Sequence, residues 1–260
     1  MTQVAPLVGA VCVGLIAGTS SGLLGVSPGG PLVVLSTLLL GADQHLAQGI
    51  SLAAQIPPTG ISGVNRYRAE GHRSSLRWVL WLAGGMVVGG TVGATVAAHA
   101  SGTVLRWSYV GYLIALDILV ILRSGPAPEA VDTRDGEQAI AASALLLVGL
   151  VAGLSSGYLG IGGGLAIVVG LTACLKIPQH QAQMTGLLLT IMPITACAAY
   201  VYWRAGQLPS LPVLLAVIVG LWAGTNLGAR LANRLPRSRL RSLLIVNVTA
   251  MALYMAWKAL

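Results

Sequence analysis

The chain has 260 residues, of which 55% are hydrophobic and only 8% are charged, and its mean hydropathy is +0.82. A soluble domain carries about 25% charged residues, so the composition excludes a water-soluble globular fold and indicates a polytopic all-α membrane protein. The formal net charge of +8 comes from basic residues in short gaps between apolar runs, which favours basic loops at a membrane face over a nucleic-acid groove.

The N-terminus and the cysteines add further expectations. The sequence MTQVAPLVGAV has no basic residue before its apolar run, which argues against a cleaved signal peptide. Cys12, Cys174 and Cys197 lie inside apolar segments without a CxxC pair, so we expect small buried hydrophobes and neither a metal site nor a cofactor. No nucleophile–base pair or nucleotide loop is present, and no enzymatic activity is expected.

Apolar segments follow one another along the whole chain, with one hydrophilic break. They are predicted over 6–24, 29–41, 46–65, 76–98 and 103–122, and then over 139–159, 164–176, 181–203, 210–233 and 240–258. A full span needs about 20 residues, so 29–41 and 164–176 are candidates for half-helices, re-entrant pieces or parts of broken helices. The total is eight to ten segments, four or five in each half. The predicted units are a first repeat (1–122), a cytoplasmic linker (123–138) and a second repeat (139–260).

The two halves are related by a fixed offset of 135 residues. The stretch 14–34, GLIAGTSSGLLGVSPGGPLVV, returns at 149–169 as GLVAGLSSGYLGIGGGLAIVV, with twelve of 21 positions identical. Polar residues keep the same register, since Gln44-His45 returns as Gln179-His180 and Tyr67 returns as Tyr202. Chance similarity between apolar sequences does not preserve polar positions, so the chain is predicted to contain a duplication.

The distribution of arginine indicates how the repeats are oriented. The loop 66–77 has four arginines, while its counterpart at 201–212 has one; the loop 230–241 has five, while its counterpart at 95–106 has one. Short basic loops mark the cytoplasmic side, so equivalent loops are expected on opposite faces. This is the inverted-topology repeat of many secondary transporters, with both chain termini on the extracytoplasmic side.

The glycine-rich stretches are the first candidate site. Non-helical backbone is tolerated at membrane depth only inside protein or beside a water-filled cavity. Exposed amides, a helix N-terminus near residue 164 and serine hydroxyls would together suit an anion. Close helix packing is the alternative; we favour packing for Gly14, Gly18, Gly22, Gly149, Gly153 and Gly157, and a site for 160–164.

The second candidate is a polar helix face. Gln44, Gln48, Ser51 and Gln55 share one face of a helix, and the second half carries Gln179, His180, Gln183 and Thr190, with Thr185 nearby. His45 and His180 are candidates for proton coupling, the alternative being caps at the headgroups. Pro58 and Pro193 are predicted to kink these helices.

Together these features predict one central anion site between the halves. Its candidate substrate-binding residues are Ser20, Ser21, Gly25, Ser27, Gly29, Gln48, Ser51, Ser155, Ser156, Gly160, Gly162, Gly163, Gly164, Gln183 and Thr185.

The duplicated stretch ending in glycines 162–164, followed by Ala47-Gln48-Gly49-Ile50-Ser51-Leu52 and its counterpart Ala182-Gln183-Met184-Thr185-Gly186-Leu187, resembles the TauE/SafE sulfite and organosulfonate exporter family, also called the 4-toluene sulfonate uptake permeases. The first half departs from the family pattern, with Ser27-Pro28 in place of glycines. The resemblance spans nearly the whole chain. It implies secondary transport of a small sulfur-containing or organic anion across the cytoplasmic membrane of a bacterium.

The expected activity is therefore ion-gradient-driven transport by alternating access. A passive anion channel of the same architecture is the alternative. The expected partners are a small anion, the lipid bilayer and a coupling proton or cation, with no nucleic acid. The sequence leaves open the anion, the direction of transport and the oligomeric state.

Overall fold

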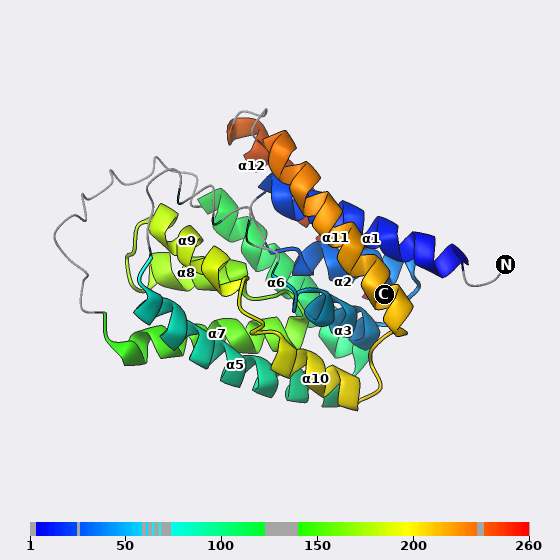
Figure 1. Cartoon of the computed structure of the whole chain (residues 1–260), viewed down its shortest axis with the longest axis horizontal. Coiled ribbons are helices and arrows are strands. Elements are labelled where there is room, and N and C mark those ends of the chain that lie inside the picture. Colours follow the sequence, from blue (N-terminus) through cyan, green and yellow to red (C-terminus); the bar gives the residue numbers. More distant parts are fainter. Residues whose placement is uncertain are drawn as a thin grey trace.

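The computed structural model describes residues 4–24, 27–58, 74–122, 140–232 and 237–259, together with positions 61, 64 and 68. These residues form helices and no strand (Figure 1), which confirms the all-α fold class. The helices are α1 (Val4–Leu24), α2 (Gly29–Leu39), α3 (Gln44–Ala54), α5 (Leu76–His99), α6 (Gly102–Leu122), α7 (Ala142–Leu159), α8 (Gly164–Ala173), α9 (Gln179–Leu189), α10 (Ala196–Arg204), α11 (Leu211–Ala232) and α12 (Arg237–Ala259).

Long and short helices have different roles in this architecture. Within the described part of the chain, four helical segments are long and apolar enough to cross a membrane: Pro6–Leu24, Leu76–His99, Ala142–Leu159 and Leu211–Leu231. By contrast, α2, α3, α8 and α9 have 11, 11, 10 and 11 residues. At 1.5 Å per residue such a helix covers about 16 Å, roughly half of the hydrocarbon core. The predicted half-helices at the glycine-rich stretches are thus confirmed for α2 and α8.

The offset of 135 residues also holds for the helix boundaries. α2 and α8 begin at Gly29 and Gly164, and α5 and α11 begin at Leu76 and Leu211. The starts of α3 and α9, and of α6 and α12, are separated by the same number of residues. The duplication seen in the residues is therefore a duplication of structural elements.

Two predicted segments, 46–65 and 181–203, are not single helices. α3 ends at Ala54 and α9 ends at Leu189, and a turn over 190–195 separates α9 from α10. Pro58 and Pro193 lie beyond the helix ends rather than within a helix. Proline lacks an N–H group and disfavours helical backbone at the residue before it, so these prolines accompany breaks, and the predicted kinks are wrong.

Glycine ladders hold α1, α5, α7 and α11 each against a helix from the other repeat. A Cβ added at Gly14, Gly18 or Gly22 of α1 would overlap the backbone of α11 near Val217, Leu221 and Thr225 respectively. The matching ladder on α7 packs against α5, where a Cβ at Gly153 would overlap the backbone of Met86. The packing predicted for these glycines is confirmed, and it interlocks the two repeats.

The interlocked pairs run in opposite directions. Successive ladder contacts advance together along both helices, so α1 is parallel to α11 and α5 is parallel to α7. Along the long axis of the molecule, the first pair runs against the second (Figure 1). Because α1 corresponds to α7 and α11 to α5, equivalent helices point in opposite directions, as expected for an inverted repeat.

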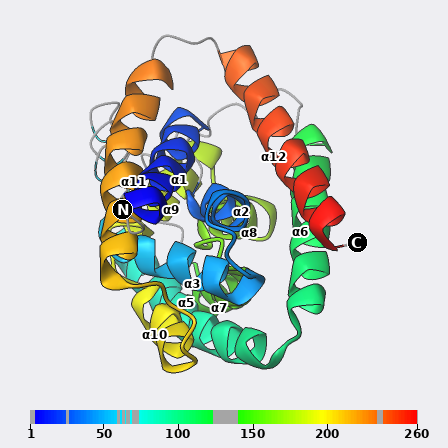
Figure 2. The ribbon, with the colours of Figure 1, turned by 90° about the vertical axis from the view of Figure 1, so that its right-hand side faces the viewer.

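One end of the molecule gathers the start of α1, the turn between α2 and α3, and the end of α12. A Cβ on Gly9 would approach Leu40 Cδ2 at 3.2 Å, and Lys258 Nζ donates to the Thr37 carbonyl at 3.0 Å. Viewed from this end, α2 and α8 lie in the middle, with α1 and α11 on one side and α6 and α12 on the other (Figure 2). Arg77 at the start of α5 and Arg230 near the end of α11 lie at the opposite end.

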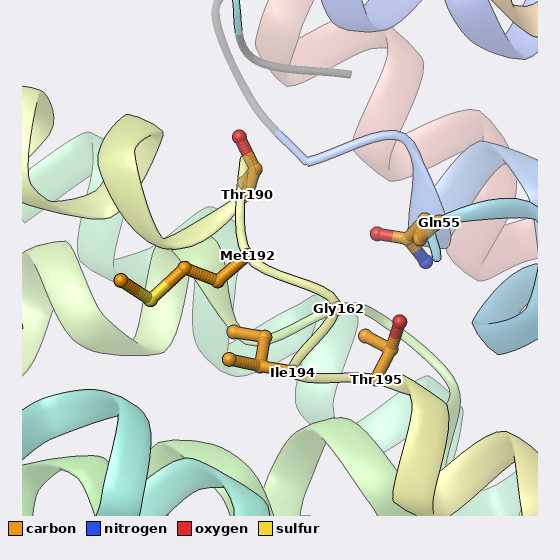
Figure 3. A pocket seen from close by; sticks show the side chains of 6 residues that line it. All are labelled: Gln55, Gly162, Thr190, Met192, Ile194 and Thr195. Atoms are coloured by element: carbon orange, nitrogen blue, oxygen red, sulfur yellow. The ribbon is translucent and has the colours of Figure 1, made fainter. Parts of the chain in front are cut away.

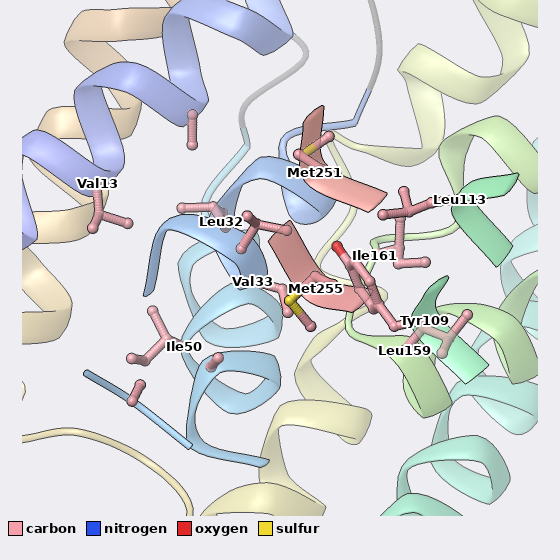
Figure 4. Close-up of a cluster of buried hydrophobic side chains, with 14 of the residues drawn as sticks. Val13, Leu32, Val33, Ile50, Tyr109, Leu113, Leu159, Ile161, Met251 and Met255 are labelled. Atoms are coloured by element: carbon pink, nitrogen blue, oxygen red, sulfur yellow. The ribbon is translucent and has the colours of Figure 1, made fainter. Parts of the chain in front are cut away.

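A packed apolar core lies inside the molecule, and apolar side chains also cover its exterior. A central cluster of buried side chains surrounds α2 and includes Leu32, Val33, Tyr109 and Ile161 (Figure 4). The long helices expose large apolar side chains outward, among them Leu253 and Trp257. An apolar exterior around a packed interior is the arrangement that a bilayer requires.

Candidate functional site

The centre of the molecule is a crossing between two non-helical turns. The turn at 27–28 leads into α2, and the turn at 160–163 joins α7 to α8. A Cβ at Gly29 would overlap the backbone of Ile161, so these turns touch through their main chains. Gly160, Gly162 and Gly163 have φ of 74°, 83° and 66°, a left-handed conformation that glycine alone adopts without strain.

The end of α3 ties the two turns together. The Ser51 hydroxyl lies 2.6 Å from the Gly160 carbonyl and 3.2 Å from the Gly29 carbonyl. The Gln55 side-chain Nε2 donates to Ser51 Oγ at 3.1 Å and to the Ser51 carbonyl at 3.0 Å. The Ser27 hydroxyl lies 2.9 Å from both Gln55 Oε1 and the Ile161 carbonyl. Side chains of the first repeat thus hold the glycine turn of the second.

Both half-helices begin at this crossing without a side-chain cap. α2 follows Pro28 and α8 follows Gly163, and neither of these N-cap residues makes a side-chain capping hydrogen bond. The first N–H groups of a helix have no partner within it and carry partial positive charge. The two N-termini therefore present polar, positively polarised backbone at the same buried region.

A small hollow with a cavity volume of about 10 Å³ lies beside the glycine turn (Figure 3). Gln55 and Thr190, which are repeat counterparts, both line it, and so does Gly162, the counterpart of Ser27. The remaining wall is formed by Met192, Ile194 and Thr195 from the turn between α9 and α10. Because repeat-equivalent positions of both halves line it, the hollow lies near the pseudo-twofold axis that relates the two repeats.

A buried tyrosine reaches the crossing from α10. The Tyr202 hydroxyl donates to Gln48 Oε1 at 2.8 Å and lies 3.2 Å from the Gly157 carbonyl. A second buried tyrosine, Tyr109 of α6, donates to the Gly30 carbonyl in the first turn of α2 at 2.8 Å. These bonds position α3 and α2 from outside the glycine turns.

Several polar groups along α3 and beside the hollow are buried without a hydrogen-bond partner. Among the described residues they include both amide atoms of Gln44, Nε2 of Gln48 and Oγ1 of Thr195. A buried polar group left unpaired costs about 1–3 kcal/mol. Of these residues, Thr195 lines the hollow, so its hydroxyl is a candidate ligand group there.

The structure brings together only some of the candidate residues. Ser27, Gly29, Gln48, Ser51, Gly160 and Gly162 meet at the crossing, and the Cβ of Ser156 lies 3.3 Å from a Cβ built on Gly163. Gly164 begins α8 at the same place. Gly25 lies outside the described residues.

Other candidates are engaged elsewhere. Ser155 Oγ donates to the Val151 carbonyl of its own helix at 3.0 Å. Thr185 Oγ1 donates to the Gln181 carbonyl at 2.7 Å and lies 2.7 Å from Ser74 Oγ. Ser20 and Ser21 of α1 and Gln183 of α9 are not among the residues that line the hollow.

His45 has a capping position in the structure. Its Nε2 lies 3.1 Å from both the Ala97 and Ala100 carbonyls at the end of α5. Two carbonyl acceptors require this nitrogen to carry the proton, so the ring acts as a donor at the end of α5. His180 begins α9, and its side chain lies outside the described part of the chain.

Sequence reasoning placed Gln55 and Thr190 on the polar helix face but left them out of the candidate site, and it assigned no role to Thr195, Tyr109 or Tyr202. One signal was available for Tyr202, because it recurs with Tyr67 at the repeat offset. The turn over 190–195 gave no comparable signal, since its contribution depends on where α9 ends.

Comparison with known proteins agrees with this architecture. The sequence model of the family "Sulfite exporter TauE/SafE" matches residues 10–255. The "Probable membrane transporter protein YdhB" of Bacillus subtilis (strain 168) is 27% identical over 238 residues, covering 91% of this chain and 95% of the relative. A "Probable membrane transporter protein" of Xylella fastidiosa (strain Temecula1) is 28% identical over 258 residues, covering 95% and 93%. No solved structure matches the chain significantly. The chain therefore belongs to the TauE/SafE sulfite exporter family of membrane transporters.

Proposed function

We propose that this membrane transporter is a secondary transporter that moves a small anion across the cytoplasmic membrane by alternating access. The anion is sulfite, a sulfonate or a related organosulfur or organic anion, and its movement is coupled to an ion gradient. The observation that carries the proposal is the meeting of two uncapped helix N-termini, those of α2 and α8, at a buried crossing beside a polar hollow.

The chemistry of the crossing suits an anion. Helix N-termini favour negative charge and offer free N–H donors, and the hollow adds the Gln55 amide and the Thr190 and Thr195 hydroxyls. No charged side chain is buried among the described residues. Neutral donors bind an oxyanion through hydrogen bonds without the strong attraction of a buried cation, which suits a site that must release its ligand.

The inverted repeat supports alternating access as the mechanism. In transporters built this way, substrate sites lie at the repeat interface, where broken helices point their N-terminal ends at anionic groups. The crossing lies between α2 and α3 of the first repeat and α7 and α8 of the second. The name of the matched family, sulfite exporter, supports a sulfur oxyanion as the first substrate to test.

The test is counterflow in proteoliposomes. Vesicles loaded with unlabelled sulfite or methanesulfonate should transiently accumulate the labelled anion above its external concentration, and an imposed pH gradient should change the rate. A passive channel equilibrates the label but cannot accumulate it, so simple equilibration would favour the alternative. No flux of either anion, or of acetate, would contradict the proposal.

The site itself is tested by removing its donors. Thr195→Val keeps the shape of the side chain and removes the buried hydroxyl, so transport should fall at least tenfold while the protein stays folded. Thr172→Val is a matched control, because the Thr172 hydroxyl donates to the Val168 carbonyl of its own helix at 2.8 Å and is absent from the hollow. Equal rates for the two variants would remove Thr195 from the site.

A further inference from the structure

One face of α3 forms a buried polar row from the end of the molecule to its centre. Gln44, Gln48, Ser51 and Gln55 are 1%, 0%, 0% and 7% exposed, and their spacing puts them on one side of the helix over about three turns. The row begins beside the turn that packs against the start of α1, and it ends at the hollow, which Gln55 lines.

The outer half of the row consists of two amides that leave hydrogen-bonding atoms unpaired. Gln44 has neither its Oε1 nor its Nε2 in a hydrogen bond, and Gln48 leaves its Nε2 unpaired. The inner half is different, because Ser51 and Gln55 are bonded to each other and to the glycine turns. Packing alone would favour apolar residues such as Ala47 and Ile50, which fill the core from another side of the same helix.

Tyr202 closes the row at the boundary between these halves. Its side chain is 0% exposed and contacts α3 through Gln48 Oε1 and α7 through the Gly157 carbonyl. The hydroxyl thereby links the first repeat to the second just outside the crossing.

The equivalent row on α9 is less enclosed. Gln183 and Thr190, the repeat counterparts of Gln48 and Gln55, are both partly exposed. Equivalent positions of the two halves thus differ in burial, which is the asymmetry that a state closed on one side would produce.

We propose that the Gln44–Gln48–Ser51–Gln55 face is the anion's route between the hollow and the end of the molecule that holds the chain termini. The Gln44 and Gln48 amides bind the anion transiently as it moves along this route. The hydrogen bond between Tyr202 and Gln48 closes the route in this structure. The inference rests on the proposed transport function, and it assigns to Gln44 and Tyr202 roles that the central site does not require.

The test uses single-cysteine variants in a background where Cys12, Cys174 and Cys197 are replaced by alanine. An anionic, membrane-impermeant methanethiosulfonate is applied to vesicles from the side of the chain termini. Gln44→Cys and Ser51→Cys should react at least tenfold faster than Ala47→Cys, which lies at the same depth but faces the apolar core. Ala53→Cys, which is 3% exposed, is a second control.

Adding Tyr202→Phe tests the closure. It removes the hydroxyl while keeping the ring, so Ser51→Cys, which lies beyond Gln48, should react several-fold faster, with little change at Ala47→Cys. Reaction of Gln44→Cys and Ser51→Cys at the rate of the controls would overturn the route, and an unchanged rate with Tyr202→Phe would overturn the closure.

Counterflow measured on the same vesicles separates this inference from the proposed function. Active counterflow with unreactive cysteines would leave the transporter but remove the route along α3. Absence of counterflow in the cysteine-free parent would count against the proposed function, whatever the labelling shows.

Discussion

At the scale of single residues, a glycine can be required for its positive φ, for the lack of space for a Cβ atom, or for both. Gly162 has φ of 83°, and a Cβ there would overlap Gln55 Oε1 and lie 2.5 Å from Ser27 Oγ. Gly206 has a similar φ of 72° but no heavy atom within 4 Å of its Cβ position. The two positions therefore share the backbone requirement and differ in the contact.

Gly162→Ala should accordingly cost more than Gly206→Ala. Left-handed backbone costs an L-residue about 1–2 kcal/mol, and both variants should lose that stability in thermal unfolding in detergent. Only Gly162→Ala must also displace Gln55 and Ser27, so it should unfold at a lower temperature and lose most transport. Similar unfolding temperatures and rates for the two variants would show that the crossing is not tightly packed.

His45 makes a structural hydrogen bond and is also a candidate for proton coupling, and two substitutions separate these roles. His45→Ala removes the donor to the Ala97 and Ala100 carbonyls and should lower the unfolding free energy by about 1 kcal/mol. His45→Gln retains an N–H donor and should stay close to the parent in stability.

Proton coupling through the histidines predicts a separate outcome. A His45→Gln, His180→Gln double variant should transport without dependence on a pH gradient, because neither glutamine titrates. Retained pH dependence with normal stability would exclude the histidines as the coupling groups and leave His45 as a cap.

At the scale of elements, the glycine ladders decide which helices are neighbours. Gly18 of α1 and Gly153 of α7 are repeat counterparts, and a Cβ at either would overlap backbone of the partner helix, at Leu221 and Met86. Close backbone approach replaces the hydrophobic driving force that is absent between helices in lipid.

Gly18→Ala and Gly153→Ala should therefore weaken the fold in parallel. Each forces two backbones apart, and both should lower the unfolding temperature and the transport rate. Gly84→Ala is the control, because its Cβ meets no atom within 4 Å and alanine favours the helix by about 1 kcal/mol. A loss at only one of the two positions would contradict equivalent interlocking of the repeats.

The sequence predicted these elements better than it predicted their partners. Glycine spacing and the offset of 135 residues indicated packing ladders, half-helices and the duplication. They did not indicate that α1 packs on α11 from the other repeat, because a local pattern carries no information about its partner. The breaks after Ala54 and Leu189 were missed, since the apolar runs continue through them and the prolines were interpreted as kinks.

The site was predictable to the same extent. Ser27, Gln48 and Ser51 stood out as polar residues in apolar surroundings, and the structure joins them to the glycine turns. Ser155 and Thr185 stood out equally, yet their hydroxyls donate to carbonyls one turn back in their own helices. Residue type cannot distinguish a hydroxyl that satisfies its own helix from one that faces a site.

At the scale of the whole molecule, the distribution of arginines agrees with the opposite directions of the equivalent helices. The start of α5 and the end of α11 lie at the end opposite the start of α1 (Figure 1), and these are the ends that carry Arg77 and Arg230. Arg106, at the start of α6, donates to the Lys258 carbonyl at 3.3 Å and belongs to the other end. The starts of α5 and α11, which are repeat counterparts, thus lie toward opposite ends of the molecule (Figure 1).

This arrangement predicts the membrane topology residue by residue. Single cysteines at Arg68 and Arg230, both exposed, should be labelled only after the inner face of the cell membrane is opened to an impermeant reagent. Cysteines at His99 and Arg204, also exposed, should be labelled in intact cells, because the positive-inside rule assigns the arginine-rich end to the cytoplasm. Labelling of positions 68 and 204 from the same side would contradict the inverted repeat, whereas a complete exchange of sides would keep the fold and reverse its orientation in the membrane.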